Sequence, residues 1–398
     1  MEILITANSP GEIAALLKPV AREIKKKSPS ASITVALLPC LFASGREAEV
    51  VREMEWVDKV CPARKFFPLL NGPKPKKETI LLHLGGDLMY AAQLARKWEI
   101  RAWAYIWARQ SRDRFFKGYF VRHDKDEERL RKQEISPDKI IRVGDLVVDS
   151  VYGSLSGKQD SSSSGKGFRV CFMPGSRLQE VTALGPFFLE VASRIEEVFP
   201  GSEFHLLLSP FLKKDDVLRV LSGRPDRKLG GLQGEVLSEE GLFRSAGGVG
   251  LRLVSESQYD FLSRADLAIA VPGTKTGEAG CLGIPIITIL PLNRVDAVPF
   301  FGLIGLLDLI PFVGKSLKGA LLLKFIVPRF GFMAQPNILA GREIVPEMLQ
   351  FMTAGDVAGK ALELLQDETL RKRISQELLE LYAPHRGAAE RLVERMLT

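Results

Sequence analysis

The sequence predicts an α/β protein built from two doubly wound domains. Three observations support this prediction. Short apolar runs alternate with amphipathic, helix-like segments along most of the chain, which is typical of βαβ units and parallel sheets. The 398 residues exceed the roughly 250–300 that one hydrophobic core usually serves. A Gly- and Ser-rich stretch at 153–167 has no apolar periodicity and indicates a linker. We therefore expect one domain at 1–155 and a second at 168–365.

In the first half, each expected strand is an apolar run followed by a turn or a helical pattern. The run EILITA (2–7) ends at the turn NSPGE, and the helix-like stretch 13–27 follows it. TILLHLGGD (79–87) precedes the amphipathic segment 88–98 in the same way. The strands expected in this half are 2–7, 32–39, 79–87 and 101–108.

The alternation restarts after the linker. FRVCFMP (168–174) leads into a long helical pattern, and DLAIAVPG (266–273) leads into a second helix start. The strands expected in this half are 168–174, 202–210, 251–255, 266–273 and 284–291. Doubly wound domains bind ligands at the carboxyl ends of their strands, so we expect a ligand in a cleft between the two domains.

The composition of the chain indicates which class of protein it belongs to and in which compartment it is expected. The chain is 46% hydrophobic and 26% charged, which is typical of a soluble globular protein. Its formal charge of +7 suits an anionic partner without selecting one. The four cysteines lie far apart and the first residues lack a signal-peptide pattern, so we expect a reducing, cytoplasmic setting. The aromatic residues of 101–120 alternate like the inner face of a strand, so nucleic acid is not expected as a partner. The four histidines show no ligand spacing and are expected to be structural or surface residues.

The stretch CFMPGSRLQEV (171–181) predicts a strand, a tight turn and a helix start. Gly175 lets the backbone approach a ligand closely, and the N–H groups of a helix start attract an anion. We expect Ser176 to cap the helix and Arg177 to present a planar fork to a phosphate or diphosphate. Glu180 follows three residues later and is included in the candidate site. The alternative is a capped helix whose arginine is solvated.

A second strand–turn–helix corner follows at VPGTKTGEAG (271–280). Gly273 and Thr274 stand at the helix start, and Thr276 belongs to the same candidate site. Glu278 lies one turn further, where a carboxylate can accept hydrogen bonds from a ribose diol. The alternative for Glu278 is a solvated helix face. Two such corners in one half favour a nucleoside diphosphate. The chain has neither G-x-G-x-x-G after its first strand nor a Walker A motif, which argues against a dinucleotide or ATP hydrolysis.

Several segments resemble the lipid A disaccharide synthase family, glycosyltransferases with the two-domain GT-B architecture. These segments are MPGSRLQEV (173–181), PGTKTGEAGCLGIPII (272–287), QPNILAGREIVPEMLQ (335–350) and VGDLVVDSV (143–151). The resemblance implies that the second domain binds a UDP-sugar donor, with Arg177 near the diphosphate and Glu278 near the ribose. It also implies that Asn337 and Arg342 line the same cleft. The C-terminal helix, about 380–398, is expected to cross back onto the first domain.

The first half departs from the family pattern, mainly on the acceptor side. The family opens with Gly-Glu-x-Ser-Gly-Asp after its first strand, whereas this chain has ANSPGE (7–12). A glycine turn and an acid, Glu12, are retained, and a plain proline turn is the alternative. The family's Asp after the third strand matches Asp87, but LMYAA replaces the residues that usually follow it. Asp145 stands where the family usually has a histidine.

The resemblance implies transfer of a diacylglucosamine from UDP to a lipid-linked glucosamine 1-phosphate. Asp87, at the carboxyl end of a strand, is the candidate general base, and Glu12 is the second catalytic candidate. Asp87 precedes a helical pattern, so a purely capping role is the alternative. No Asp-x-Asp pair is placed for a metal–diphosphate bridge, so we expect neither a metal nor another cofactor, and direct displacement would invert the anomeric centre.

The segment 297–332 is the most apolar in the chain, and its charged residues from Leu309 onward are all basic. Its longest uncharged run, 11 residues, is shorter than the ~20 needed to span a bilayer. We therefore expect it to lie on an anionic membrane surface and the protein to be peripheral at the inner face of the cytoplasmic membrane. An interior helix pair or a homodimer contact is the alternative.

The sequence is also compatible with three other functions. A related transferase with a different lipid or sugar acceptor would share the donor site. A UDP-sugar epimerase would release an altered sugar without an acceptor. A UDP-sugar-binding or lipid-binding protein without activity would bind the nucleotide and not turn over.

Overall fold

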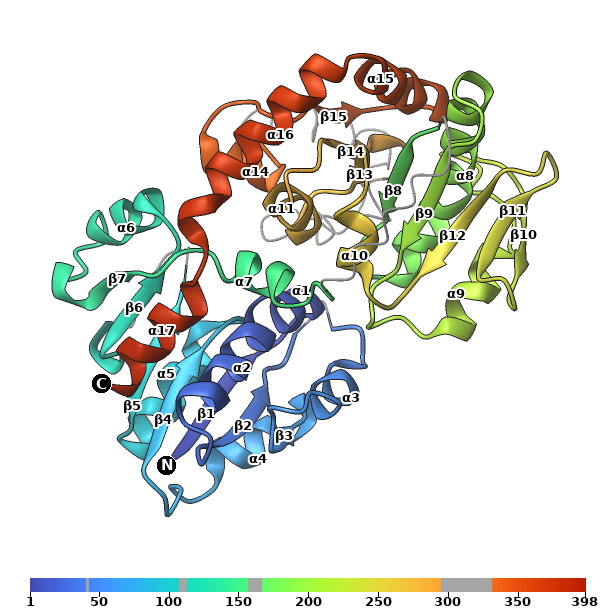
Figure 1. Cartoon of the computed structure of the whole chain (residues 1–398). Helices are drawn as coiled ribbons and strands as arrows, with labels where there is room; N and C mark the ends of the chain where they lie inside the picture. Colours follow the sequence, from blue (N-terminus) through green and yellow to red (C-terminus); the bar gives the residue numbers. More distant parts are fainter. Residues whose placement is uncertain (41–42, 107–112, 157–166, 295–330) are drawn as a thin grey trace, which may run out of the picture. The chain divides into compact units, whose positions relative to one another are not determined.

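The computed structural model describes residues 1–40, 43–106, 113–156, 167–294 and 331–398 (Figure 1). These residues form two compact units. The first contains Met1–Ser154 and Tyr382–Thr398, and the second contains Leu155–Leu381. Within the described ranges, no helix is long and apolar enough to cross a membrane. The apolar segment 297–332 lies almost wholly outside the described residues, so the structure does not bear on its predicted membrane contact.

The first unit is a seven-stranded sheet in the order β3-β2-β1-β4-β5-β6-β7, and all its pairs are parallel. The strands are β1 (Glu2–Ala7), β2 (Ser32–Leu37), β3 (Lys59–Cys61), β4 (Thr79–His83), β5 (Arg101–Tyr105), β6 (Gly118–Val121) and β7 (Ile140–Arg142). The strand order reverses between β1 and β4, which are direct neighbours. The loops that follow these two strands therefore open at the switch point where doubly wound sheets bind ligands.

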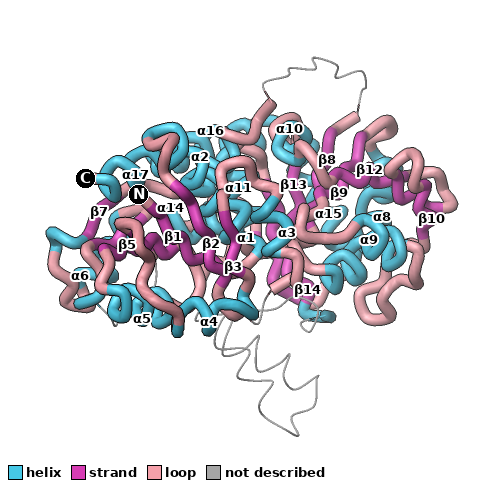
Figure 2. The backbone as a smooth tube through the Cα atoms, turned by 90° about the horizontal axis from the view of Figure 1, so that it is seen from below, coloured by secondary structure: helices cyan, strands magenta, loops and turns pink. Residues whose placement is uncertain are grey.

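Helices cover both faces of this sheet. Figure 2 shows α4 and α5 on one face and α2 on the other. The helices are α1 (Pro10–Glu12), the π-helical η1 (Ile13–Leu17), α2 (Lys18–Lys27), α3 (Glu47–Arg52), α4 (Phe66–Asn71), α5 (Leu88–Trp98), α6 (Asp124–Arg131), α7 (Leu146–Tyr152) and α17 (Ala388–Leu397), with 3₁₀ turns at Ala63–Lys65, Asp113–Phe115, Pro137–Lys139 and Ala383–His385.

The C-terminal helix α17 belongs to the first unit, as predicted. It packs against α2 and α7. Lys27 of α2 pairs with Glu390 at 3.0 Å and with Glu394 at 2.6 Å. The Asp149 carboxylate of α7 accepts hydrogen bonds from the backbone N–H groups of Gly387 and Ala389. The last turns of the chain are therefore tied to the first unit by both apolar packing and charge.

The second unit is an eight-stranded sheet in the order β10-β11-β12-β9-β8-β13-β14-β15. The strands are β8 (Arg169–Met173), β9 (Glu203–Leu207), β10 (Gly234–Leu237), β11 (Leu242–Ser245), β12 (Gly250–Val254), β13 (Leu267–Ala270), β14 (Ile286–Pro291) and β15 (Glu347–Gln350). The β10–β11–β12 edge is antiparallel and the other pairs are parallel. The order reverses at β8, which has β9 on one side and β13 on the other.

The helices of the second unit are α8 (Leu178–Val198), α9 (Lys214–Leu221), α10 (Gln258–Leu262), α11 (Thr274–Cys281), α14 (Gln335–Ala340), α15 (Ala354–Gln366) and α16 (Glu368–Tyr382), with a 3₁₀ turn at Leu292–Arg294. One contiguous apolar core lies under α8 and α15, and it includes Phe172, Phe187 and Phe188. Phe172 and Phe188 stack with their ring centroids 4.8 Å apart, which fixes α8 on its sheet.

All the strands expected from the sequence are present, although most end earlier than predicted. The strand expected at 79–87 ends at His83 because Gly85 and Gly86 turn the chain. Six further strands were not expected. They are β3, β6, β7, β10, β11 and β15, and each has only three or four residues. Such short segments contain too few residues to show a period of two.

Candidate functional site

The first corner of the second unit runs from β8 through Gly175 into α8. Gly175 has a φ of +115°, and a Cβ at this position would lie 2.1 Å from Oε2 of Glu180. The backbone conformation therefore requires glycine, and a larger residue would also displace the Glu180 carboxylate. The prediction that Ser176 caps α8 is wrong, because Arg177 occupies the N-cap position. The backbone N–H of Arg177, at the start of the helix, donates instead to the Glu180 carboxylate at 2.8 Å.

Glu180 reduces the number of backbone N–H groups that are free to bind an anion at this corner. Its side chain is buried, and burial raises the pKa of Glu180 while N–H groups from Arg177 and Ser176 lower it. The same carboxylate lies 3.4 Å from the Arg177 guanidinium. A diphosphate here would be held by the Arg177 guanidinium and the remaining amides, because one helix-end N–H already has a carboxylate partner.

The second corner runs from β13 through Gly273 into α11. Gly273 has a φ of +135°, and a Cβ there would meet no atom within 4 Å, so only the backbone conformation requires glycine. Thr276 is fully buried. Its hydroxyl donates to the Gly273 carbonyl at 2.8 Å and accepts the Gln335 N–H at 2.9 Å. Thr276 therefore joins α11 to α14.

Glu278 does not lie on a solvated helix face, which was the alternative to its ligand role. Its side chain is 3% exposed, and Lys275 Nζ donates to Oε2 at 2.9 Å. Sequence reasoning missed Lys275, although its spacing of three residues before Glu278 is the spacing of an ion pair on one helix face. The pair places a positive and a negative group together in the first two turns of α11.

The two corners follow neighbouring strands. Met173 of β8 pairs with Ala270 of β13, and the Val271 N–H donates to the Met173 carbonyl at 3.3 Å. The turns containing Gly175 and Gly273 therefore open at the same edge of the sheet, at its switch point. This is the arrangement that the nucleotide hypothesis requires of the second unit.

Asn337 and Arg342 lie further along, on and just after α14. Asn337 is fully buried, and its amide nitrogen donates to the Val345 carbonyl and to Glu347 Oε1, each at 2.8 Å. Its carbonyl oxygen accepts from the backbone N–H groups of Ile344 and Val345. Both polar atoms of the Asn337 amide therefore have hydrogen-bond partners within the protein, and these bonds hold the loop before β15. The Arg342 side chain is 61% exposed and pairs with Glu377 at 2.8 Å.

In the first unit, Glu12 and Asp87 follow the neighbouring strands β1 and β4. Glu12 is the third residue of α1 and accepts the Ser9 N–H at 3.3 Å, and burial raises the pKa of Glu12. A Cβ at Gly85 would lie 2.1 Å from Glu12 Oε2, so the two loops touch. Asp87 caps α5: its Oδ1 accepts the Met89 N–H at 2.8 Å. Asp87 is exposed, and its capping role is confirmed, whereas its role as a base stays a prediction.

Three polar side chains beside these acids were not predicted. His83 faces Thr6 across the β1–β4 pair, with Nδ1 2.9 Å from the Thr6 hydroxyl. Burial lowers the pKa of His83 to about 4, so the ring is neutral at pH 7. Asn8 Oδ1 is buried and accepts no hydrogen bond within the described residues. Asn8 lies beside Gly86, since its Nδ2 would be 3.0 Å from a Cβ there. An unsatisfied acceptor at a switch point is a place for a ligand's hydroxyl or amide.

The chain is similar in sequence to curated lipid-A-disaccharide synthases. It is 26% identical over 236 residues to that of Nitrosococcus oceani, covering 58% of this chain and 49% of the relative. It is 26% identical over 272 residues to that of Sulfurihydrogenibium sp., covering 67% of this chain and 61% of the relative. The chain spans about half the length of the curated relatives it matches. No protein-family model matches it.

Solved structures show the same fold. UDP-GlcNAc 2-epimerase from Neisseria meningitidis, bound to UDP-GlcNAc, has a TM-score of 0.56 and 13% identity, covering 100% of both chains. UGT89C1 from Arabidopsis thaliana, complexed with UDP, has a TM-score of 0.53 and 15% identity, covering 100% of this chain and 99% of that one. The protein therefore has the GT-B-like fold that glycosyltransferases and epimerases share. Within that class it is a distant homologue, at about 26% identity, of lipid-A-disaccharide synthases.

Proposed function

We propose that the protein is an inverting glycosyltransferase that transfers a glucosamine-type sugar from UDP to a lipid-linked glucosamine 1-phosphate. The observation that carries the proposal is the pair of glycine corners after the neighbouring strands β8 and β13. One corner presents Arg177 and the other presents Glu278 with Lys275. The similarity to lipid-A-disaccharide synthases supports this choice of reaction.

In this proposal the second unit binds the donor. The Arg177 guanidinium faces the diphosphate, and its planar fork suits phosphate oxygens. Glu278 accepts hydrogen bonds from the ribose hydroxyls, while the Lys275 ammonium, which donates to Oε2, holds its carboxylate in place. As the sugar–oxygen bond breaks, negative charge grows on the departing diphosphate, and Arg177 stabilises this charge electrostatically.

The first unit supplies the acid–base chemistry. The acceptor hydroxyl oxygen attacks the anomeric carbon, the bond from that carbon to the diphosphate oxygen breaks, and UDP leaves. The hydroxyl proton passes to a carboxylate, for which Asp87 is the candidate. Its capping bond uses Oδ1, so Oδ2 can take the proton. Glu12 is the second candidate, because a raised pKa makes a carboxylate a stronger proton acceptor.

The described residues also offer a surface for an anionic membrane. Phe67 on α4 is 51% exposed and packs edge-on against Tyr90, with ring centroids 6.1 Å apart. Residues 59–77 around this helix contain no acid. The basic residues of that stretch are Lys59, Arg64, Lys65, Lys74, Lys76 and Lys77. Exposed aromatic area with flanking cations is typical of a segment that rests in a lipid headgroup layer, where a lipid-linked acceptor would be reached.

A UDP-sugar 2-epimerase is the second candidate, because epimerase structures align over the whole chain. Such an enzyme would use water in place of the acceptor, so that the bond from the anomeric carbon to the diphosphate breaks and UDP and an altered sugar are released. It would need no membrane surface and no acceptor.

The two candidates separate in one experiment. The protein is incubated with UDP-diacylglucosamine or UDP-GlcNAc, with and without a diacylglucosamine 1-phosphate acceptor, and released UDP is measured. A transferase releases UDP only when the acceptor is present, whereas an epimerase releases it without the acceptor. UDP binding with neither UDP release nor an altered sugar under any condition would overturn both enzymatic proposals. Arg177→Lys serves as the donor-site variant, since it keeps the charge and removes the fork.

A further inference from the structure

A pocket of about 460 Å³ lies within the first unit, at the carboxyl ends of β6 and β7. Its walls are the residues that follow these two strands and the chain around the start of α17. Neither Asp87 nor Glu12 lines it. The volume is within the roughly 300–1,000 Å³ range of small-molecule sites. It is thus a separate concavity with no role in the proposal above.

Nitrogen-bearing side chains dominate its described lining. Three guanidinium groups and two imidazoles face one acid, Asp124. The five are Arg122, His123, Arg142, His385 and Arg391. They come from three segments that are up to 269 positions apart in the sequence (391 minus 122), which is why no spacing rule predicted them.

Arg391 is positioned so that its charge remains available. Its Nε–H donates to the Val143 carbonyl at 2.7 Å. Within the described residues, its two terminal nitrogens make neither a hydrogen bond nor an ion pair, and the Asp149 carboxylate acts on the guanidinium only through space. Gly144, with a φ of +103°, makes room for the group, since a Cβ there would lie 2.8 Å from one terminal nitrogen. A guanidinium anchored at Nε presents its terminal pair as a fork that matches two phosphate oxygens.

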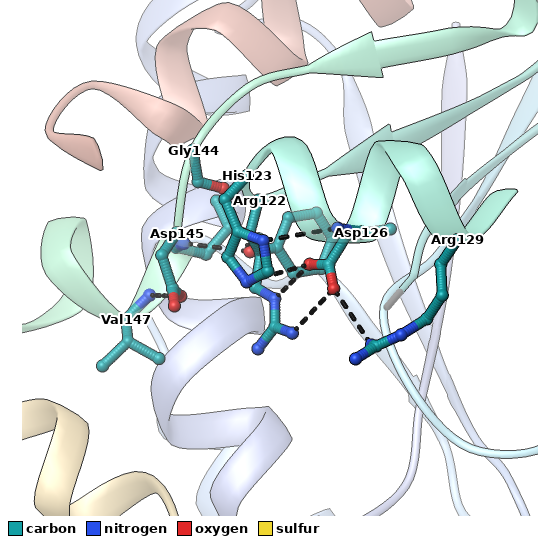
Figure 3. A network of polar contacts seen from close by, with 9 residues as sticks. Arg122, His123, Asp126, Arg129, Gly144, Asp145 and Val147 are labelled. Carbon is teal, nitrogen blue, oxygen red and sulfur yellow. Dashed lines mark hydrogen bonds and ion pairs between the residues drawn. The ribbon is translucent and has the colours of Figure 1, made fainter. Parts of the chain in front are cut away.

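The neighbouring arginine is held rigidly by a buried acid. Arg122 donates to both oxygens of Asp126, at 2.7 and 3.2 Å, and the Asp126 side chain is 0% exposed. Arg129 and His123 also contact this carboxylate, as Figure 3 shows. Arg142 pairs with Asp124 at the rim. Asp124 and Asp126 therefore each have a basic partner already, and neither of them pairs with Arg391.

The two imidazoles complete the wall. The ring centroids of His123 and His385 are 6.5 Å apart. Burial lowers the pKa of both rings, to about 4 for His123, so both are neutral at pH 7. Neutral imidazoles present polar nitrogens without adding repulsion between cations.

We infer that this pocket binds a phosphate monoester, with Arg391 as its main anchor and Arg142 as its second cation. The binding of a phosphate monoester does not depend on the donor site of the second unit. Its assignment to the acceptor, whose glucosamine 1-phosphate carries such a group, rests on the proposed function. The competing explanation is that Arg391 only clamps α17 to the first unit through the Val143 carbonyl.

The test is calorimetric titration of the full chain with inorganic phosphate and with glucosamine 1-phosphate. All titrations use an Arg177→Gln background, so that phosphate bound at the second unit does not contribute. We expect saturable binding of both ligands. Arg391→Gln should weaken it at least about tenfold, and Arg142→Gln by several-fold, since each removes a charge-assisted hydrogen bond. Arg395→Gln, an exposed arginine of the same helix outside the pocket, should change nothing.

Two outcomes would overturn the inference. One is the absence of saturable binding by the parent protein at millimolar ligand. The other is an unchanged dissociation constant in the folded Arg142→Gln variant, which keeps the inference testable if Arg391→Gln does not fold. Flotation with vesicles containing phosphatidic acid identifies the source of the monoester. Competition by glucosamine 1-phosphate would assign a lipid-borne group. UDP release and UDP binding are measured separately, so failure of the donor-site proposal leaves this result intact.

Discussion

Lys275 and Glu278 form a buried ion pair in the first two turns of α11, with 2.9 Å between Nζ and Oε2. Their side chains are 16% and 3% exposed. A buried pair contributes little net stability, but loss of one partner leaves an uncompensated charge that costs about 3–5 kcal/mol. The pair is therefore better suited to hold a carboxylate in place than to stabilise the fold.

This relationship predicts a specific pattern of mutant behaviour. Lys275→Met should destabilise the second unit, and the double variant Lys275→Met with Glu278→Gln should recover most of that loss. UDP affinity should not recover if Glu278 binds the ribose as proposed, because the carboxylate that accepts the ribose hydroxyls is absent from both variants. We then expect UDP affinity to be about tenfold weaker in Glu278→Gln and in the double variant. Urea unfolding and UDP calorimetry measure the two effects. Wild-type UDP affinity in the double variant would exclude Glu278 from the nucleotide site.

Substitutions that remove the charge of Asp87 or of Glu12 distinguish which of the two carboxylates acts as the general base. Asparagine caps helices as well as aspartate does, so Asp87→Asn should keep stability within about 0.5 kcal/mol. If Asp87 is the base, UDP release in the presence of acceptor should fall by about 10²-fold or more. Glu12→Gln is the matched comparison, since its side chain is also at the β1–β4 switch point. Normal turnover in Asp87→Asn with lost turnover in Glu12→Gln would transfer the role to Glu12.

Gly85 is predicted to be intolerant of substitution. A Cβ at this position would lie 2.1 Å from the Glu12 carboxylate, which is itself buried. Gly85→Ala should destabilise the protein by about 1–3 kcal/mol, as overpacking usually does. Gly359 on α15 is the control, because nothing lies within 4 Å of a Cβ there. Gly359→Ala should stabilise the helix by up to about 1 kcal/mol. Equal thermal midpoints for the two variants would contradict the close contact.

Much of the fold could be predicted, because long apolar runs and helical patterns alternate in both halves. The two glycine corners were also identifiable, since Gly175 and Gly273 have backbone conformations that other residues rarely adopt. What could not be predicted depends on three-dimensional proximity. The side chain that accepts a hydrogen bond at the start of α8 is that of Glu180 rather than that of Ser176, because the glutamate is long enough to reach back to the Arg177 N–H. His83 meets Thr6, and Arg391 meets Val143, only through strand pairing and the return of the C-terminal helix.

Buried neutral histidines predict acid sensitivity. Burial lowers the pKa of His83, His123 and His205 to about 4 from the usual value near 6.5. The unfolded chain therefore binds more protons than the folded one between these pH values, and stability should fall as the pH is lowered from 6.5 toward 4. Each such group contributes up to about 1.4 kcal/mol per pH unit within that window.

His205 offers the cleanest check of this effect. Its Nδ1 is buried with no hydrogen-bond partner in the part of the chain that the structure describes, and its ring lies 5.1 Å from that of Phe261. His205→Phe should leave stability at pH 8 nearly unchanged and make it less dependent on pH below 6.5. Urea unfolding at pH 8, 6 and 5 gives the slope directly. An identical slope in wild type and variant would show that His205 is not neutral in the folded protein.

The proposed membrane contact at α4 predicts how two sets of variants bind lipid vesicles. Phe67→Ser removes the exposed aromatic ring, and Lys74→Glu with Lys76→Glu reverses two charges in the stretch that contains no acid. Both variants should reduce binding to phosphatidylglycerol vesicles, and the binding of the charge variant should depend less on salt, because each cation contributes about 1 kcal/mol of electrostatic attraction. Phe351, 58% exposed on the second unit, supplies the control Phe351→Ser, for which binding should be unchanged. Vesicle co-sedimentation at low and high salt measures each variant. If the Phe67 and lysine variants bind like the wild type, α4 is not the contact surface, and the apolar segment 297–332 stays the predicted one.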